Sequence, residues 1–141
     1  MAYYRQIYQT FWTDTKVDDE FTPEDKYFYL YLLTNPHTNL CGCYEISIKQ
    51  MVRETGYNDD TILRLLKRFA NEHFVISYCT ATSEILLLNW SKYNWSKSID
   101  TLKGVAKEAQ YIKCEAFKKE VFRMIECKKN DTPYRGSIDP L

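Results

Sequence analysis

The chain contains 141 residues, of which 45% are hydrophobic, and its 19 basic and 19 acidic residues give a formal net charge of zero. This length suits one domain with an apolar core, whereas no apolar run approaches the roughly 20 residues that cross a bilayer. The first ten residues also lack the basic and apolar regions of a secretory signal. We therefore expect a cytoplasmic protein without a membrane partner, and the neutral charge weighs against tight non-specific binding to nucleic acid.

Aromatic and large aliphatic side chains recur in the first twelve residues, at Tyr4, Ile7, Tyr8, Phe11 and Trp12. An arm with this much apolar surface is unfavourable in water. We expect it to pack on the domain or on a second copy of the chain. Tyr4, Tyr8, Phe11 and Trp12 are therefore candidate oligomerisation residues.

A helix and a short strand are predicted next. Residues 22–25 are typical of a helix start, because a threonine can cap, a proline suits the first helical position and two carboxylates occupy the first turn. Residues 27–33 are almost wholly apolar or aromatic, so this helix should be buried in the centre of the domain until residues 35–36 end it. Residues 42–46 alternate in the manner of a strand.

Two helices joined by a tight turn are predicted, the first from Ser47 to Gly56 and the second from near Asp59 through Phe69. Ser47 is a candidate N-cap for the first helix, and Gly56 supplies the left-handed position that ends it. Asn58 caps the second helix, whose first turn carries Asp59 and Asp60 where the helix dipole favours negative charge. This arrangement is typical of a helix-turn-helix, in which the second helix contacts nucleic acid.

The second of these helices is amphipathic. Its apolar residues recur at the spacing of one buried side, at Ile62, Leu65, Leu66 and Phe69. The opposite side is polar and net positive, with Thr61, Arg64, Lys67 and Arg68. We interpret this polar side as the DNA-binding surface, whose cations approach phosphates or base edges. The competing interpretation is a solvated helix surface without a ligand.

Two strands joined by a small polar turn are predicted at residues 74–79 and 84–90. This hairpin would form a three-stranded sheet with residues 42–46. The order of elements is that of a winged helix-turn-helix, an α+β fold that is mainly α. The turn at residues 80–83 contains no Arg or Lys. Because a wing that enters a minor groove normally uses a cation there, we predict a wing that is structural or makes only weak backbone contacts.

The triplets at residues 90–92 and 95–97 both read Trp-Ser-Lys. Aromatic rings beside Lys92 and Lys97 would suit single-stranded DNA, with the rings stacking on bases and the lysines binding phosphates. The alternative, which we favour, is that Trp90 closes the core and Trp95 anchors a linker, because large aromatic residues are mostly buried for packing.

One long amphipathic helix with an apolar stripe is predicted from Asp100 to about Lys128. Such a stripe needs a partner surface, either the winged domain or the same helix of a second subunit. Phe117, Val121 and Met124 are therefore further candidate oligomerisation residues. These patterns divide the chain into a winged-helix domain with its arm, a C-terminal helix and a polar tail, at residues 1–97, 98–129 and 130–141.

Catalytic and metal sites are not predicted. The five cysteines lack the paired two-residue spacing of zinc ligands, and His37 near Cys41 and Cys43 is the only ligand-like cluster. The two histidines lie outside any catalytic motif and leave few ways to build a nucleophile with its base. The glycines form no phosphate-binding loop. We expect no metal, no cofactor and no enzyme activity.

Several short motifs follow one another in an informative order. They read FWTD, YLLTNP, CYEI, ETGY, LLKRF and NWSKYN, at residues 11–14, 31–36, 43–46, 54–57, 65–69 and 89–94. In this order they resemble the N-terminal domain of phage replisome organisers and DnaD-like replication initiators. The resemblance covers about residues 3–97 and depends on the sequence of motifs more than on any one of them.

This resemblance implies a winged-helix protein that forms a homo-oligomer, binds origin DNA as duplex or single strand, and helps to recruit a helicase loader or helicase in a bacterial or phage-infected cell. It implies no enzyme activity. The second helical domain that many members carry has no matching motif here, so its functions are not expected. Two alternatives stay open, namely an oligomerisation module that does not bind DNA and a winged-helix transcription regulator.

Overall fold

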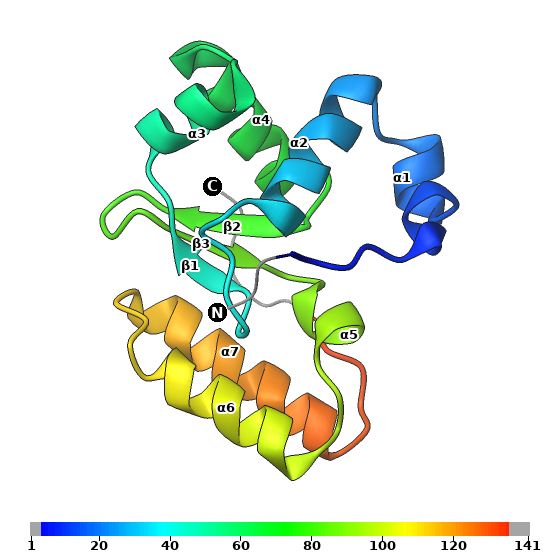
Figure 1. Ribbon diagram of the computed structural model, residues 1–141, viewed down its shortest axis with the longest axis vertical. Helices are drawn as coiled ribbons and strands as arrows, with labels where there is room; N and C mark the ends of the chain where they lie inside the picture. The colour runs from blue at the N-terminus through cyan, green and yellow to red at the C-terminus, as the bar shows by residue number, and fades with distance from the viewer. Residues whose placement is uncertain (1–3, 136–141) are drawn as a thin grey trace.

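Helices make up most of residues 4–135, the part of the chain that the computed structural model describes, and three short strands form one antiparallel sheet (Figure 1). The elements, in chain order, are the 3-10 helix η1 (Gln9–Trp12), α1 (Thr15–Asp19), α2 (Pro23–Thr34), β1 (Cys43–Glu45), α3 (Ile48–Thr55), α4 (Asp59–Asn71), β2 (Ile76–Cys79), β3 (Glu84–Leu87), α5 (Trp90–Asn94), α6 (Ile99–Ala109) and α7 (Glu115–Lys129). The fold is α+β and mainly helical, as predicted. Within the described residues, no helix has the length and apolar character that crossing a membrane requires.

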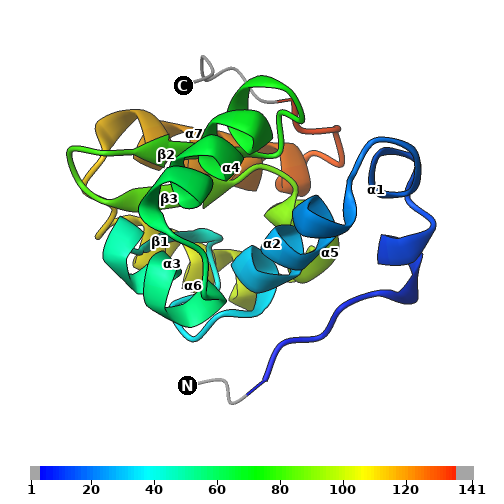
Figure 2. The same cartoon turned by 90° about the horizontal axis from the view of Figure 1, so that it is seen from above.

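The sheet lies between two layers of helices. Its strands are ordered β1–β3–β2, and both neighbouring pairs are antiparallel. Helices α2, α3 and α4 lie on one side of the sheet, and the pair α6 and α7 lies on the other (Figure 1; Figure 2 gives the view from above). A single hydrophobic cluster extends through these layers.

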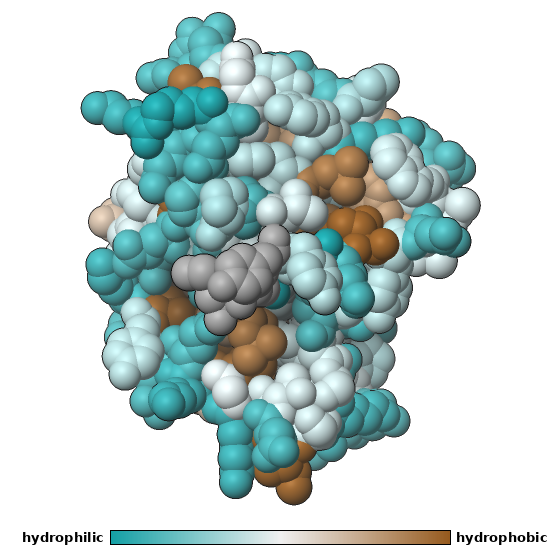
Figure 3. Space-filling model, in the orientation of Figure 1, coloured by the Kyte–Doolittle hydropathy of each residue, from teal (hydrophilic) through white to brown (hydrophobic). Residues whose placement is uncertain are grey.

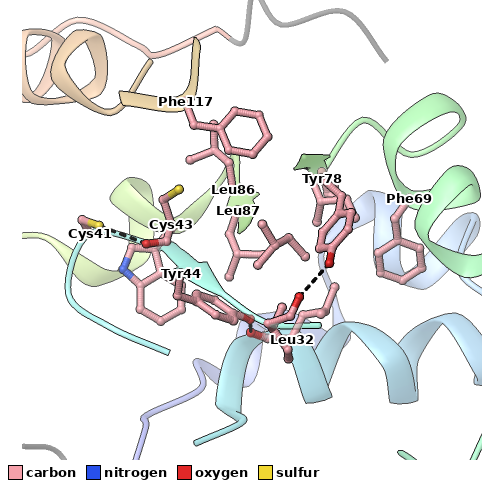
Figure 4. Packing of buried hydrophobic residues seen from close by; sticks show 14 of the residues in the cluster. Leu32, Cys41, Cys43, Tyr44, Phe69, Tyr78, Leu86, Leu87 and Phe117 are labelled. Carbon is pink, nitrogen blue, oxygen red and sulfur yellow. Dashed lines mark hydrogen bonds between the residues drawn. The ribbon is translucent and has the colours of Figure 1, made fainter. Parts of the chain in front are cut away.

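Residues alternate between the two faces of the sheet. Tyr44 of β1 points toward α2, where its hydroxyl donates a hydrogen bond to the carbonyl of Leu32 at 2.6 Å (Figure 4). Leu86 of β3 points toward the opposite layer, and Figure 4 shows it beside Phe117 of α7. Each face of the sheet therefore buries one helical layer, which is the expected result of the two-residue period of a strand.

Local signals set the ends of α3 and α4. The hydroxyl of Ser47 accepts a hydrogen bond from the backbone N–H of Gln50, and the Gln50 side chain accepts one from the backbone of Ser47. Gly56 ends α3 with φ of 86° in the left-handed region. Asn58 caps α4 by accepting from the N–H of Thr61 at 2.9 Å. The predicted start and end of α3 and the predicted start of α4 are confirmed.

The prediction of one helix over residues 100–128 is wrong, because the chain forms α6 and α7 with a turn between them. The carboxylate of Glu84 in β3 holds this turn by accepting hydrogen bonds from the backbone N–H groups of Lys113 (2.9 Å) and Cys114 (2.7 Å). A straight helix of that length would span about 40 Å and extend past the sheet. Two shorter helices instead bury both apolar sides.

The apolar side of α7 belongs to the core of its own chain. Phe117, Val121 and Met124 are each no more than 4% exposed. Their prediction as oligomerisation residues is therefore wrong, since the single chain already covers them. They share one hydrophobic cluster with residues of α2, α4 and the sheet. The expected domain boundary after residue 97 consequently does not separate two cores.

Helix α5 replaces part of the predicted linker. Trp90 and Trp95 are buried, and their indole N–H groups both donate to the carbonyl of Leu40, at 2.9 and 2.7 Å. The packing interpretation is confirmed, and rings buried in this way are not available to stack on bases. Of the predicted tail, residues 130–135 follow α7, whereas residues 136–141 lie outside the described residues, as do residues 1–3 of the arm.

Candidate nucleic-acid interface

Helix α4 presents the predicted polar side to solvent. Arg64 and Lys67 are exposed, and Thr61 and Arg68 are half-buried. The exposed Leu63 lies among them, and this side of α4 is open to solvent. Figure 3 shows a mostly hydrophilic surface over α3 and α4. The predicted orientation of α4 is confirmed, because its apolar side is buried at Ile62, Leu65, Leu66 and Phe69.

Arg64 forms an ion pair with Glu24 in the first turn of α2, with 2.6 Å between the guanidinium nitrogen Nη2 and the carboxylate oxygen Oε1. Both side chains are well exposed, at 54% and 36%. An exposed pair of this kind contributes only about 0–1 kcal/mol. A phosphate that approached Arg64 would therefore displace Glu24 at little cost.

Arg68 is held much more firmly than Arg64. Its Nε lies 3.1 and 3.0 Å from the two carboxylate oxygens of Asp25, and its Nη1 lies 2.8 Å from Glu72. Asp25 is only 1% exposed. Withdrawing Arg68 toward a ligand would leave a buried carboxylate without its cation, which is strongly unfavourable. The prediction that Arg68 contacts DNA therefore needs correction, because Arg68 joins α4 to α2.

Asp25 is the centre of a buried polar network. Its carboxylate accepts hydrogen bonds from Arg68 and from the backbone N–H of Thr22 at 3.0 Å, and it lies 3.1 Å from Nε2 of the buried His73. Burial raises the pKa of Asp25, but the hydrogen bonds from Arg68, Thr22 and His73 together outweigh burial and lower that pKa below its usual value. Lys16 of α1 also contacts His73, because its Nζ donates a hydrogen bond to the backbone carbonyl of His73 at 2.7 Å.

Of the three predicted cations on α4, Arg64 and Arg68 form ion pairs, whereas Lys67 pairs with no carboxylate of residues 4–135. Glu24 and Asp25 are the acidic residues that pair with Arg64 and Arg68. In the sequence alone, they indicate only the negative charge that favours the start of a helix. Glu24 and Asp25 are adjacent in α2, and Arg64 and Arg68 are one turn apart in α4, so the two pairs match in spacing. Recognising the match requires knowing that α2 and α4 pack together.

Lys92 and Lys97 lie away from α4. Lys92 belongs to α5, where its Nζ lies 5.1 Å from the ring centroid of Tyr93. Lys97 precedes α6 and forms an exposed ion pair of 2.6 Å with Asp131. Figure 1 shows α5 and the start of α6 distant from α4. The structure thus does not gather the six predicted DNA-binding residues into one surface.

The N-terminal arm packs against α2 and α5 through part of its aromatic content. Phe11 is buried, whereas Tyr4, Tyr8 and Trp12 are more than half exposed. The ring of Tyr8 meets that of Tyr93 edge-on, with 5.5 Å between centroids. A small cavity lies beneath the arm, lined by side chains of the arm, α1, α2 and α5. The arm therefore packs on its own chain, which is one of the two predicted alternatives. Three of its aromatic rings stay more than half exposed.

The predicted ligand-like cluster around His37 is a set of polar contacts. Nε2 of His37 lies 2.8 Å from Glu54, and the hydroxyl of Tyr31 donates to the same carboxylate at 2.5 Å. Burial raises the pKa of Glu54, but the hydrogen bonds from Tyr31 and His37 lower it by more. Cys41 and Cys43 are buried elsewhere in the core. No three His, Cys, Asp or Glu side chains of residues 4–135 are arranged to hold a metal ion.

Comparisons of the chain with models of protein families, with curated proteins and with solved structures give no match.

Proposed function

We propose that residues 4–97 form a winged-helix domain that binds DNA, with α4 as the recognition helix. The order α2, β1, α3, α4, β2, β3 and the strand order β1–β3–β2 support this fold. The observation that carries the proposal is that α4 is capped, packed through one side only, and projects Arg64 and Lys67 from its open side. A helix held in this way can enter a major groove.

Lys67 and Arg64 are the proposed contacts to DNA, and Thr61 assists from the first turn of α4. Among the residues that the structure describes, Lys67 has no carboxylate to exchange, and Arg64 exchanges only an exposed pair with Glu24. Arg68 acts as a positioning residue, because its bond to Asp25 sets the angle between α4 and α2. Two principal cations on a protein of zero net charge imply weak binding with a shallow salt dependence.

The proposal extends to replication initiation because of the motifs that resemble replisome organisers. In that role the partners are origin DNA and a helicase loader or helicase. Co-elution of the protein with origin DNA and a loader on size-exclusion chromatography tests this extension. Binding to DNA without co-elution of a loader would limit the role to DNA binding.

Replacing both Arg64 and Lys67 with alanine is expected to weaken binding to duplex and single-stranded DNA about tenfold at low salt. The slope of log K against log salt should become shallower by about 2, since each lost phosphate contact removes about one unit. Fluorescence anisotropy over a salt series measures both quantities for the two kinds of DNA.

The matched control is Lys119→Ala, which removes an exposed cation from α7 on the other side of the sheet. It should leave the affinity and the slope unchanged. Equal losses per cation removed, in the control and in the double variant, would show that binding depends on overall charge. An unchanged slope in the double variant would remove α4 from the proposed interface.

A second candidate function is self-assembly through the arm, favoured by the three exposed rings of Tyr4, Tyr8 and Trp12. Replacing Tyr8 and Trp12 with serine is then expected to convert an oligomer into a monomer, as measured by light scattering after size exclusion. Tyr111→Ser is the matched control, because Tyr111 is 78% exposed at the turn between α6 and α7. A wild-type protein that is monomeric at high concentration would contradict this function.

A further inference from the structure

Two half-buried thiols lie at the junction of the sheet with the α6–α7 turn. Cys79 ends β2 and is the direct cross-strand partner of Glu84 in β3. Side chains of directly opposed residues project from the same face of a sheet, with Cβ atoms about 5 Å apart. The carboxylate of Glu84 in turn accepts a hydrogen bond from the backbone N–H of Cys114 at 2.7 Å. Glu84 therefore brings Cys79 and Cys114 to the same place.

The two thiols lie near enough for each to affect the pKa of the other. The pKa of Cys79 is lowered, chiefly by the side chain of Thr82 and further by Cys114. The pKa of Cys114 is raised, chiefly by burial and further by Cys79. Cys79 is accordingly the more nucleophilic of the two, since the thiolate is the reactive form.

We propose that Cys79 and Cys114 are a site of reversible oxidation, at which a peroxide converts the two thiols into an intrachain disulfide. This inference does not depend on the proposed function, because it concerns the opposite face of the sheet from α4. The Cys79 thiolate attacks one oxygen of hydrogen peroxide, the O–O bond breaks, and the departing hydroxide takes a proton to become water. Cys79 is thereby oxidised to a sulfenic acid.

Cys114 completes the reaction. Its thiolate attacks the sulfur of Cys79, the S–S bond forms, the S–O bond breaks, and hydroxide leaves as a second water with the proton from Cys114. Two thiols and one peroxide therefore give one disulfide and two waters. A small thiol reductant reverses the bond by exchange.

The other three cysteines are poorer candidates for this chemistry. Cys41 and Cys43 are only 1% and 2% exposed, and burial raises the pKa of each thiol. Cys127 lies thirteen residues beyond Cys114, or about 20 Å along α7. Cys43 is the relevant competitor, because its pKa is also raised by the nearby thiols of Cys79 and Cys114.

The test uses the full chain, purified with all its thiols reduced and then treated with a small excess of hydrogen peroxide. The expected product is lighter by two hydrogen atoms, and peptide mapping without reductant should link Cys79 to Cys114. Closing this loop should raise the melting temperature by about 5–10 °C, and added dithiothreitol should reverse the rise.

Single substitutions distinguish the role of Cys79, which reacts with peroxide, from that of Cys114, which forms the disulfide. In Cys114→Ser, Cys79 should accumulate as a sulfenic acid that dimedone labels, whereas Cys79→Ser should show no such label at Cys114. The control Cys127→Ser should form the disulfide as the wild type does. A linkage that contains Cys43, a product joined between two chains, or equal labelling of all the half-buried thiols would overturn the proposal.

Discussion

Replacing Asp25 with alanine is expected to lower the free energy of unfolding by about 3–5 kcal/mol, as when one partner of a buried ion pair is removed. The substitution removes the acceptor of three donors, namely Nε of Arg68, the ring nitrogen of His73 and the backbone N–H of Thr22. The last of these groups is half of the capping box that starts α2. One substitution would therefore weaken both the start of α2 and its attachment to α4.

The measurement is urea unfolding followed by circular dichroism at 222 nm. The matched control is Glu24→Ala, which removes the neighbouring acidic residue and its exposed pair with Arg64. It should cost no more than about 1 kcal/mol. If Asp25→Ala and Glu24→Ala lower the free energy of unfolding by amounts within about 1 kcal/mol of each other, the assignment of Asp25 as the buried residue that joins α2 to α4 is contradicted.

The same network predicts how stability depends on pH. The pKa of Asp25 is lowered from its usual 3.8, so the folded protein holds this carboxylate ionised more strongly than the unfolded chain does. Its contribution is therefore complete above about pH 4 and is lost as the pH falls below 3.8 through the folded-state pKa. In Asp25→Asn, this part of the acid destabilisation should be absent. A variant with the same loss of stability in acid as the wild type would contradict the prediction.

The elements that the sequence predicted correctly are those set by neighbours in the chain. The caps at Ser47 and Asn58, the left-handed Gly56 and the alternation around Tyr44 all act over a few residues. The side of α4 that faces solvent follows from the 3.6-residue period alone. For this reason the amino-acid sequence alone is enough to locate α3, α4 and the centres of the strands. The predicted bounds of two strands are wrong, because β2 begins at Ile76 and not at Phe74, and β3 ends at Leu87, before Trp90 starts α5.

The features that the sequence did not predict are set by residues far apart in the chain. Arg68 reaches Asp25 across 43 positions, and Glu84 holds Cys114 across 30. The first contact removes a cation from the candidate DNA surface, and the second folds a long apolar stripe into two helices. Both depend on a buried carboxylate, which nothing in the sequence around it distinguishes from a surface acid.

Replacing Gly42 with alanine is expected to be as damaging as a large core substitution, at about 3–4 kcal/mol, from backbone strain and overpacking together. Gly42 has φ of 77°, and a Cβ atom there would overlap Cγ of Trp90 and lie 2.7 Å from its Cβ. These atoms are at the base of the indole side chain, so no rotation of its far end relieves the overlap. Trp90 is also held by its hydrogen bond to Leu40.

The backbone at Gly42 cannot shift freely either, because its carbonyl accepts a hydrogen bond from the N–H of Leu87 at 2.9 Å. Gly56→Ala is the matched control, since φ is 86° there but no atom lies within 4 Å of the added Cβ. That variant carries only the backbone strain, about 1 kcal/mol. The difference in unfolding free energy between the two variants, measured in urea, thus isolates the contact with Trp90. Equal costs would mean that α5 moves away from β1 easily, and that Trp90 does not fix α5 against the sheet.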